Sequence, residues 1–267
     1  MRRIGRLALP DGPAFVELEG GRAWPLDAAP WLGGERRGHP LAGYDDEGVG
    51  PCHRLAPVAP SKIVCVGRNY RAHAEELGNE VPTEPLLFFK PPSSLLAPDG
   101  VIELPPASLS DRVEHEAELG LVIGRRLRNA SEDEGREAIW GCTVVGDVTA
   151  RDMQHREKQW TRAKGFDTFC PVGPVVVGGM AHDDVAVRCV VNDELRQDGR
   201  TSAMIFPPAM VLAYISAAMT LEPGDLIATG TPAGVGPLVD GDRVRFEVEG
   251  IGTLVADVRR GEEPGGP

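Results

Sequence analysis

Short runs in which apolar residues alternate or cluster dominate the chain, and they predict strands. Residues 62–66, with four apolar residues after Lys62, have the pattern of a buried strand, and residues 226–229 predict a second short strand. Near the end of the chain, residues 244–248 and 254–258 alternate with period two around two glycines, which is typical of a hairpin. These patterns predict a protein rich in sheet.

Three segments carry helical signals instead. Residues 70–77 precede Gly78, residues 131–140 open with the spacing of a capping box, and residues 208–219 repeat an apolar stripe. The predicted strands outnumber these helices and do not alternate with them regularly. The sequence therefore favours an α+β fold with a mostly antiparallel or mixed sheet over a Rossmann-type fold.

The first part of the chain differs from the rest. Residues 1–57 are rich in Gly, Pro and Arg and contain short alternating pieces without a helical pattern, which predicts a small β-rich N-terminal unit. Residues 58–267 then form the main domain. The polar end of the chain, residues 261–267, is expected to fray.

A run of acidic residues lies in the middle of the chain. If residues 114–124 form one strand, Glu114, Glu116 and Glu118 share a face, because strand side chains alternate. Carboxylates roughly 7 Å apart on one face repel each other, and Asp147, after a second apolar segment, can add a further one. Converging carboxylates without Cys or His suit Mg²⁺ or Mn²⁺. The alternative is a half-exposed edge strand with a solvated acidic face.

Composition and charge exclude several classes of partner. The net charge of −12 argues against a nucleic-acid or anionic-membrane partner, either of which needs a basic surface. No segment approaches the roughly 18 apolar residues of a membrane span, and the apolar stretch near the start is too short for a signal peptide. The five cysteines are scattered without CxxC spacing, which indicates reduced thiols in a cytoplasmic protein.

Two further groups of residues have the chemistry of a reactive site. His73 and Glu76 stand three apart on a predicted helix and share a face, and a carboxylate beside an imidazole favours a general base. Arg151 and Gln154 have the same spacing, and Lys164 follows them. Arginine can bind a carboxylate with two hydrogen bonds, and lysine can stabilise a developing enolate. Taken singly, each of these residues also fits an ordinary surface position.

A glycine-rich loop at residues 229–236 invites comparison with phosphate-binding loops. It lacks the GxxxxGK[ST] and GxGxxG patterns, and Pro232 removes one amide donor. A loop that presents Thr231 to a small anionic substrate fits better, and a plain tight turn is the alternative.

Six short motifs follow one another along the main body of the chain. They are VGRNYRAH (66–73), FKPPSS (89–94), EAELGLVIG (116–124), GDVTARD (146–152), WTRAKGFD (160–167) and GDLIATGTPAGVG (224–236). Together, and in this order, they resemble the motifs of the fumarylacetoacetate hydrolase family. No single motif is decisive alone.

This resemblance implies a mixed β-roll core of the family's C-terminal domain type, with residues 1–57 as a variable extra segment. It implies a homodimer, a divalent metal (Mg²⁺ or Mn²⁺) and a catalytic dyad on a mobile lid. Glu114, which is outside the family's metal triad, is then expected to be solvated. The implied site residues are Glu116, Glu118 and Asp147 for the metal, His73, Glu76 and Lys164 for catalysis, and Arg151, Gln154, Lys164 and Thr231 for the substrate's oxygens.

For activity, the resemblance implies hydrolysis of a carbon–carbon bond in a small keto acid, an acylpyruvate-like β-diketo acid. His73 would activate water, and the metal and Lys164 would hold the enolate. The family also contains isomerases of 2-hydroxymuconate-type dienoates and decarboxylases of oxaloacetate, which use the same enolate stabilisation. The pair formed by His73 and Glu76 favours hydrolysis. A non-catalytic binding protein is a third interpretation, which the intact triad and dyad disfavour.

Overall fold

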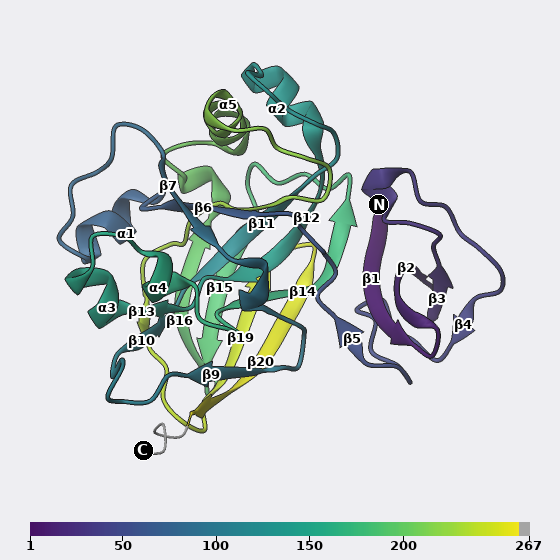
Figure 1. The fold of residues 1–267 in the computed structure, drawn as a ribbon, viewed down its shortest axis with the longest axis horizontal. Coiled ribbons are helices and arrows are strands. Elements are labelled where there is room, and N and C mark those ends of the chain that lie inside the picture. Colours follow the sequence, from purple (N-terminus) through teal and green to yellow (C-terminus); the bar gives the residue numbers. More distant parts are fainter. Residues whose placement is uncertain (262–267) are drawn as a thin grey trace, which may run out of the picture.

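The chain forms a sheet-rich fold with few helices (Figure 1). The computed structural model describes residues 1–261, so the predicted fraying of the tail, apart from Gly261, lies outside the described residues. Within that range the strands form three sheets. In the largest, β17 (Leu226–Ala228) runs parallel to β6 (Ile63–Gly67) and antiparallel to β11 (Ala117–Ile123). The predicted α+β class with a mixed sheet is confirmed.

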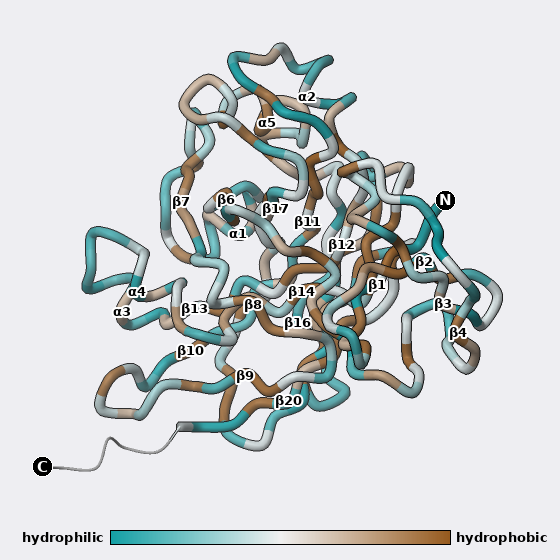
Figure 2. Tube along the Cα trace, turned by 45° about the vertical axis from the view of Figure 1, so that its right-hand side comes forward, coloured by the Kyte–Doolittle hydropathy of each residue, from teal (hydrophilic) through white to brown (hydrophobic). Residues whose placement is uncertain are grey.

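The largest sheet has twelve strands in the described part of the chain. Besides β6, β11 and β17, they are β1 (Arg2–Leu9), β2 (Gly12–Glu19), β3 (Arg22–Pro25), β4 (Leu41–Ala42), β5 (Arg54–Leu55), β7 (Leu86–Lys90), β8 (Leu95–Leu96), β12 (Ile139–Gly146) and β14 (Cys170–Gly178). Their order is β4-β3-β2-β1-β14-β12-β11-β17-β6-β7, with β5 beside β1 and β8 beside β14. All residues of β11 and β14 are buried, and Figure 2 shows hydrophobic stretches along both.

Two smaller sheets complete the described strands. One has the order β13-β10-β18 and the other β16-β15-β19-β20-β9. Their bounds are β9 (Val101–Leu104), β10 (Val113–His115), β13 (Thr149–Ala150), β15 (Ala186–Val191), β16 (Glu194–Arg200), β18 (Gly236–Pro237), β19 (Arg243–Val248) and β20 (Gly252–Arg260). The hairpin predicted near the end of the chain is formed by β19 and β20.

Five α-helices are present in residues 1–261. They are α1 (Arg71–Glu76), α2 (Glu132–Ala138), α3 (Arg151–Arg156), α4 (Thr161–Lys164) and α5 (Pro208–Ala218), and three short 3-10 turns occupy Pro30–Leu32, Pro92–Ser94 and Thr201–Ala203. The three predicted helices are confirmed as α1, α2 and α5. None of the described helices is long and apolar enough to cross a membrane.

Local sequence signals explain where α2 begins and ends. The Ser131 hydroxyl accepts the Glu134 backbone N–H at 3.3 Å, and the Glu134 carboxylate accepts the Ser131 backbone N–H at 2.8 Å. This reciprocal pair satisfies two N–H groups that a helix start otherwise leaves unpaired. The helix ends at Ala138, two residues before the predicted end, because the chain enters β12 at Ile139.

The N-terminal segment is β-rich as predicted, and its strands extend the largest sheet. Strand β1 pairs antiparallel with β14, for example Arg3 with Val177. Ile4 and Trp31 pack in an apolar cluster that also contains Val176. Residues 1–57 therefore cover an edge that β14 would otherwise expose, while the domain boundary at residue 57 stays a prediction.

Helices α1, α3 and α4 lie on the side of the molecule away from the N-terminal strands (Figure 1). Helix α1 follows strand β6, and α3 follows strand β13, while α4 follows α3 in the same connection before β14. Side chains from these helices and from the ends of the central strands can therefore meet at one place.

Candidate metal centre and active site

The acidic run occupies a crossing between two sheets. Residues 114–124 were predicted as one strand, but β10 ends at His115, β11 begins at Ala117, and Glu116 lies between them. Strand β10 pairs with β13 and β18, whereas β11 pairs with β12 and β17. The alternative of a half-exposed edge strand is wrong, because β11 is a central strand and wholly buried.

The pairing of β11 with β12 positions the last carboxylate of the predicted triad. Ala117 is opposite Gly146 in the antiparallel register, and the Asp147 backbone N–H donates to the Glu116 carbonyl at 2.8 Å. As a result, oxygens of Glu116, Glu118 and Asp147 all lie within 4.8 Å of one another, and all three residues are buried. The three carboxylates are closer together than neighbours on a single extended strand, which are about 7 Å apart.

Glu118 carries the least compensated charge of the three. Its Oε2 accepts the Gly230 backbone N–H at 2.8 Å, and no ion pair to it is present within residues 1–261. Burial, together with the charges of Asp147 and Glu116, raises the pKa of Glu118 well above its usual value. Gly230 is required for this contact: its φ is +99°, and an added Cβ would lie 2.6 Å from the Cβ of Asn69.

Two buried lysines compensate the other two carboxylates. Lys164 Nζ donates to Glu116 Oε2 at 2.8 Å and to Asp147 Oδ2 at 2.6 Å. Lys90 Nζ lies 2.8 Å from Asp147 Oδ1 and also donates to the carbonyls of Val148, Lys164 and Phe169. Burial lowers the pKa of Lys164, but Asp147 and Glu116 outweigh it and raise the pKa above the usual value. Both lysines are therefore integral to the acidic cluster.

Arg151 binds both Glu116 and Glu114, the glutamate that was expected to be solvated. Its Nε donates to Glu114 Oε2 at 2.6 Å, its Nη2 to Glu116, and its Nη1 to Gln154 Oε1 at 2.5 Å. The expectation for Glu114 is wrong: its side chain is buried, and it also accepts from Arg112 Nε at 2.7 Å. Glu114 is buried because its charge is compensated by two guanidinium groups.

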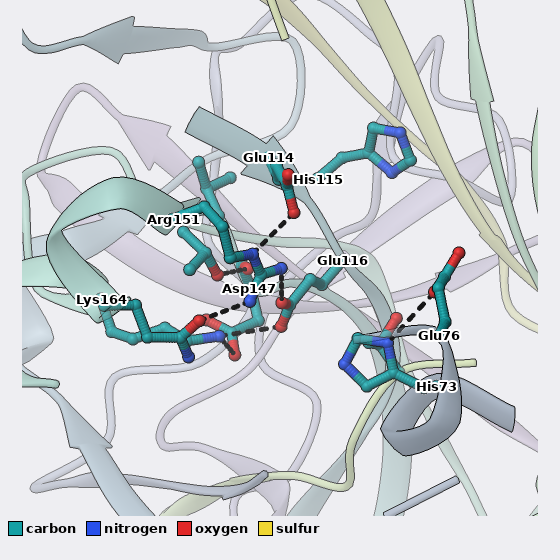
Figure 3. A network of polar contacts seen from close by, with 12 residues as sticks. His73, Glu76, Glu114, His115, Glu116, Asp147, Arg151 and Lys164 are labelled. Carbon is teal, nitrogen blue, oxygen red and sulfur yellow. Dashed lines mark hydrogen bonds and ion pairs between the residues drawn. The ribbon is translucent and has the colours of Figure 1, made fainter. Parts of the chain in front are cut away.

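The charges around Glu116 keep it ionised. Burial raises the pKa of Glu116, but the positive charges of Lys164 and Arg151 together lower it by more. The pKa of Glu116 therefore falls below its usual value. Figure 3 shows Arg151, Lys164 and Asp147 gathered on one side of Glu116, with His73 and Glu76 on the other.

His73 and Glu76 come from α1 and lie on the side of Glu116 opposite Arg151 and Lys164 (Figure 3). His73 is buried, and its Nδ1 lies 3.6 Å from Glu76 Oε2, which is longer than a hydrogen bond. Both carboxylate oxygens of Glu76 accept the Gly234 backbone N–H, at 3.0 and 3.1 Å. Burial lowers the pKa of His73 below its usual value, although Glu116 opposes the shift. The imidazole is therefore neutral near pH 7.

Gln154 and Thr231, the residues predicted to bind substrate, differ in whether their side chains still have a free hydrogen-bond donor. Because Arg151 holds the Gln154 carbonyl oxygen, the amide nitrogen of Gln154 is left to donate. The Thr231 hydroxyl already donates to the Ala117 carbonyl at 2.8 Å and accepts from Gln197 Nε2 at 2.7 Å. Contacts of these residues with a substrate stay a prediction, and the Thr231 hydroxyl proton is already engaged.

One pocket of about 60 Å³ brings most of these groups together. All predicted site residues line it except Glu76, which lies behind His73. Its lining residues are Val66, Gly67, Arg68, His73, Leu77, Asn79, Glu116, Glu118, Asp147, Arg151, Gln154, His155, Trp160, Lys164 and Thr231. Arg68, His155 and Trp160 were not predicted as site residues, although Arg68 and Trp160 lie within two of the six motifs.

Sequence reasoning also missed two buried residues that organise the site. Lys90 lies in the FKPPSS motif, but the sequence did not predict a function for it. Its four oxygen partners are brought together only by the fold. Gln197, in β16, accepts the Ala117 backbone N–H at 2.9 Å and donates to Thr231. No local signal marked Gln197. His115 lies with its Nδ1 3.3 Å from Gln197 Oε1 and points away from the cluster (Figure 3).

The donor set fits a hard divalent cation. Three buried carboxylates converge within 4.8 Å, and one of them, Glu118, has a hydrogen bond but no cation beside it. Oxygen donors without thiol or imidazole suit Mg²⁺ or Mn²⁺ better than Zn²⁺. The residues Glu116, Glu118 and Asp147 could therefore hold a metal.

The fold and the acidic site together define the C-terminal domain type of the fumarylacetoacetate hydrolases. The family model described as "Fumarylacetoacetate (FAA) hydrolase C-terminal" matches residues 62–259. The chain therefore belongs to the fumarylacetoacetate hydrolase family, a family of enzymes.

Named relatives of the chain differ in the reactions they are named for. A mitochondrial oxaloacetate tautomerase of Arabidopsis thaliana is 45% identical over 76% of this chain and 93% of the relative. "Oxaloacetate decarboxylase, mitochondrial" of Dictyostelium discoideum is 45% identical over 72% of this chain and 90% of the relative. The structure of 2-hydroxyhepta-2,4-diene-1,7-dioate isomerase from Mycobacterium marinum has a TM-score of 0.88 and 41% identity, covering 98% of this chain and 100% of that one.

Proposed function

We propose that this protein is an Mg²⁺- or Mn²⁺-dependent enzyme that forms enolates from short 2-keto acids. Its main reaction would be the keto–enol tautomerisation or decarboxylation of an oxaloacetate-like acid. The single observation that carries this proposal is the convergence of the buried carboxylate triad, Lys164 and neutral His73 in one small pocket. Relatives named as a tautomerase, a decarboxylase and an isomerase support an enolate reaction without hydrolysis.

The carboxylate triad, through a metal, and Lys164 would both stabilise the negative charge that develops in such a reaction. A divalent cation held by Glu116, Glu118 and Asp147 would act as a Lewis acid toward the keto acid. Lys164 Nζ uses two of its three N–H bonds on Glu116 and Asp147, which leaves the third for the enolate oxygen. A fixed ammonium in a buried pocket stabilises a developing negative charge more strongly than water does. Lys164 is therefore our candidate for the group that holds the enolate.

His73 would move the proton. In tautomerisation, neutral His73 takes a proton from the carbon beside the keto group, and the C–H electron pair forms the enolate. The same imidazolium then returns the proton to the enolate oxygen. In decarboxylation, the carbon–carbon bond breaks instead, CO₂ leaves, and the electron pair again forms the enolate. Burial, which lowers the pKa of His73, keeps the imidazole in the basic form near neutral pH.

Hydrolysis of an acylpyruvate is the second candidate function. The observation that favours it is the position of Glu76 Oε2, 3.6 Å from His73 Nδ1. If this distance shortens to a hydrogen bond when substrate binds, Glu76 would orient His73 to deprotonate a water. The products would be a carboxylic acid and the enolate of pyruvate, which Lys164 would hold in the same way.

A substrate panel tests the proposal. Oxaloacetate, acetylpyruvate and a 2-hydroxymuconate would each be assayed with Mg²⁺ and with EDTA. We expect Mg²⁺-dependent tautomerisation or decarboxylation of oxaloacetate to be the fastest reaction. Faster hydrolysis of acetylpyruvate would favour the second candidate, and no Mg²⁺-dependent turnover of any of the three would overturn both.

A further inference from the structure

Arg68 is an unpaired cation at the candidate active site. It lines the same pocket as Glu116, Asp147 and Lys164, and its side chain is half-buried. No ion pair or side-chain hydrogen bond of Arg68 is present within residues 1–261, whereas the other two cations of the pocket, Lys164 and Arg151, are engaged by carboxylates. An uncompensated guanidinium beside an acidic site needs an explanation.

The indole of Trp160 supports the guanidinium without neutralising it. The Arg68 Cζ lies 5.9 Å from the centre of the Trp160 ring, within the range of a cation–π contact. The ring also packs against the residue before Arg68, because a Cβ added to Gly67 would lie 2.8 Å from the Trp160 ring. Trp160 therefore restricts where the guanidinium can lie and leaves all of its N–H groups available.

The backbone of Arg68 is held in an unfavourable conformation. Its φ is +56°, in the left-handed region that residues with a Cβ seldom adopt. The next residue, Asn69, is fully buried: its amide nitrogen donates to the carbonyls of Phe206 and Thr229, and its oxygen accepts the Phe206 N–H. Such strain persists where the surroundings enforce it and is frequent at ligand-binding sites. The backbone conformation that fixes the position of Arg68 therefore lowers the stability of the fold.

We propose that Arg68 is a specificity residue that binds the second, distal carboxylate of a short dicarboxylic 2-keto acid. This inference rests on the proposed function, in which the first carboxylate and the keto oxygen face the triad. A guanidinium offers two parallel N–H groups to a carboxylate, which suits this role better than an ammonium.

The charges of the pocket lead to the same substrate class. Three acids line the pocket, Glu116, Glu118 and Asp147, together with two cations that carboxylates already engage, Arg151 and Lys164. A divalent ion would turn this single negative excess into a single positive one, which the first carboxylate of a keto acid neutralises. A second carboxylate then needs one more cation, and Arg68 is the only lining cation in residues 1–261 that is free to supply it.

Two 2-keto acids of equal length, neither of which can lose CO₂ through an enolate, test this inference. 2-Ketoglutarate carries a distal carboxylate where 2-ketovalerate carries a methyl group. With saturating Mg²⁺, calorimetry would give the Kd of each. We expect wild-type protein to bind 2-ketoglutarate more tightly, and Arg68→Asn to lose this preference through a 10- to 100-fold weaker binding of the diacid, about the range for a hydrogen bond to a charged group.

Three controls keep the result interpretable. Asn adopts positive φ more readily than Arg, so Arg68→Asn should fold with an unchanged or higher Tm. Arg68→Lys keeps the charge and should retain part of the preference. Arg71→Gln removes the same charge from an exposed position of α1 outside the pocket, and should change nothing.

The outcomes separate this inference from the proposed function. If oxalate binds with Mg²⁺ but the preference for the diacid is absent or survives Arg68→Asn, the role of Arg68 is wrong and the enolate site stands. If neither oxalate nor either keto acid binds wild-type protein with Mg²⁺, the proposed function fails, and the inference falls with it.

Discussion

At the scale of single residues, Glu118 decides how the protein responds to pH and metal. Its folded-state pKa is raised by burial and by Asp147 and Glu116, so its protonated form suits the metal-free fold. The stabilising effect of that proton is complete below the unfolded-state pKa, about 4.3 for a glutamate. It is lost as pH rises through the folded-state pKa, because the carboxylate must then ionise inside the protein.

Glu118→Gln should therefore stabilise the metal-free protein at pH 8 and have little effect near pH 4. Between the two pKa values of Glu118, the gain should grow by about 1.4 kcal/mol per pH unit. Thermal unfolding in EDTA across this pH range measures it, and calorimetry should show that Mg²⁺ binding is lost. Glu103→Gln, at an exposed position, is the matched control. Undiminished Mg²⁺ affinity in Glu118→Gln would remove Glu118 from the metal site.

His73 allows the candidate reactions to be told apart by one substitution. His73→Ala should leave Mg²⁺ affinity nearly unchanged, because His73 is not part of the carboxylate triad. Tautomerisation and hydrolysis should slow by roughly 10²–10⁴-fold, the usual effect of removing a general base. Decarboxylation needs no initial proton abstraction and should keep most of its rate. Wild-type rates of hydrolysis and tautomerisation in this variant would exclude His73 as the base.

At the scale of secondary-structure elements, α1 is a short helix whose position depends on tertiary contacts. It has six residues, and isolated helices of that length are marginal in water. The structure shows it seated on the pocket, with His73 and Ala74 buried and Glu76 bonded to the Gly234 N–H. The mobility of this lid stays a prediction, and the Glu76–Gly234 contact is the place where closure can be weakened.

Amide hydrogen exchange over residues 68–80 measures the mobility of α1 and the residues around it. We expect exchange to slow when oxalate and Mg²⁺ are added, because the closed helix would cover the ligand. Helix α2 (Glu132–Ala138), which is capped at Ser131 and does not line the pocket, provides an internal control that should not change. Equal exchange of residues 68–80 with and without ligand would mean that α1 is a fixed part of the scaffold.

Elements with local signals were the ones that the sequence could predict. Ser131 and Glu134 identified α2, and alternation at residues 244–258 identified the hairpin of β19 and β20, because these signals act within a few residues. The strand over residues 114–124 was predicted as continuous, since its pattern does not reveal that β10 and β11 join different sheets. That break at Glu116 depends on partners distant in the sequence.

The site was predictable to a similar degree and for a similar reason. The motifs and the clustering of acids pointed to Glu116, Glu118 and Asp147, which the fold brings together. The burial of Glu114 could not be predicted, because it depends on a guanidinium 37 positions away. The four oxygen contacts of Lys90 come from segments 57 or more positions away, so no local pattern marks this residue.

At the scale of the whole molecule, the N-terminal strands extend the same sheet that carries Glu118 in its central strand β11. Removing residues 1–57 would expose the edge of β14 and the apolar residues, such as Val176, that now pack against Ile4 and Trp31 of the removed segment. We expect the truncated protein to have a lower Tm and to aggregate, because an uncovered apolar edge strand is an aggregation site. Soluble truncated protein should still bind Mg²⁺. Thermal unfolding and light scattering, with calorimetry on the soluble fraction, test this; unchanged Tm would show that the N-terminal strands contribute little stability.

The most direct test of the enolate site is deuterium exchange into the methyl group of pyruvate, followed by NMR in D₂O. The enolate of pyruvate is common to oxaloacetate decarboxylation and acylpyruvate hydrolysis, so the measurement does not depend on which of these two reactions the protein catalyses. We expect exchange with wild-type protein and Mg²⁺, and none above background with EDTA or with Glu118→Gln. Exchange that is independent of Mg²⁺ and of Glu118, or no exchange at saturating Mg²⁺ and pyruvate, would contradict a metal-dependent enolate site.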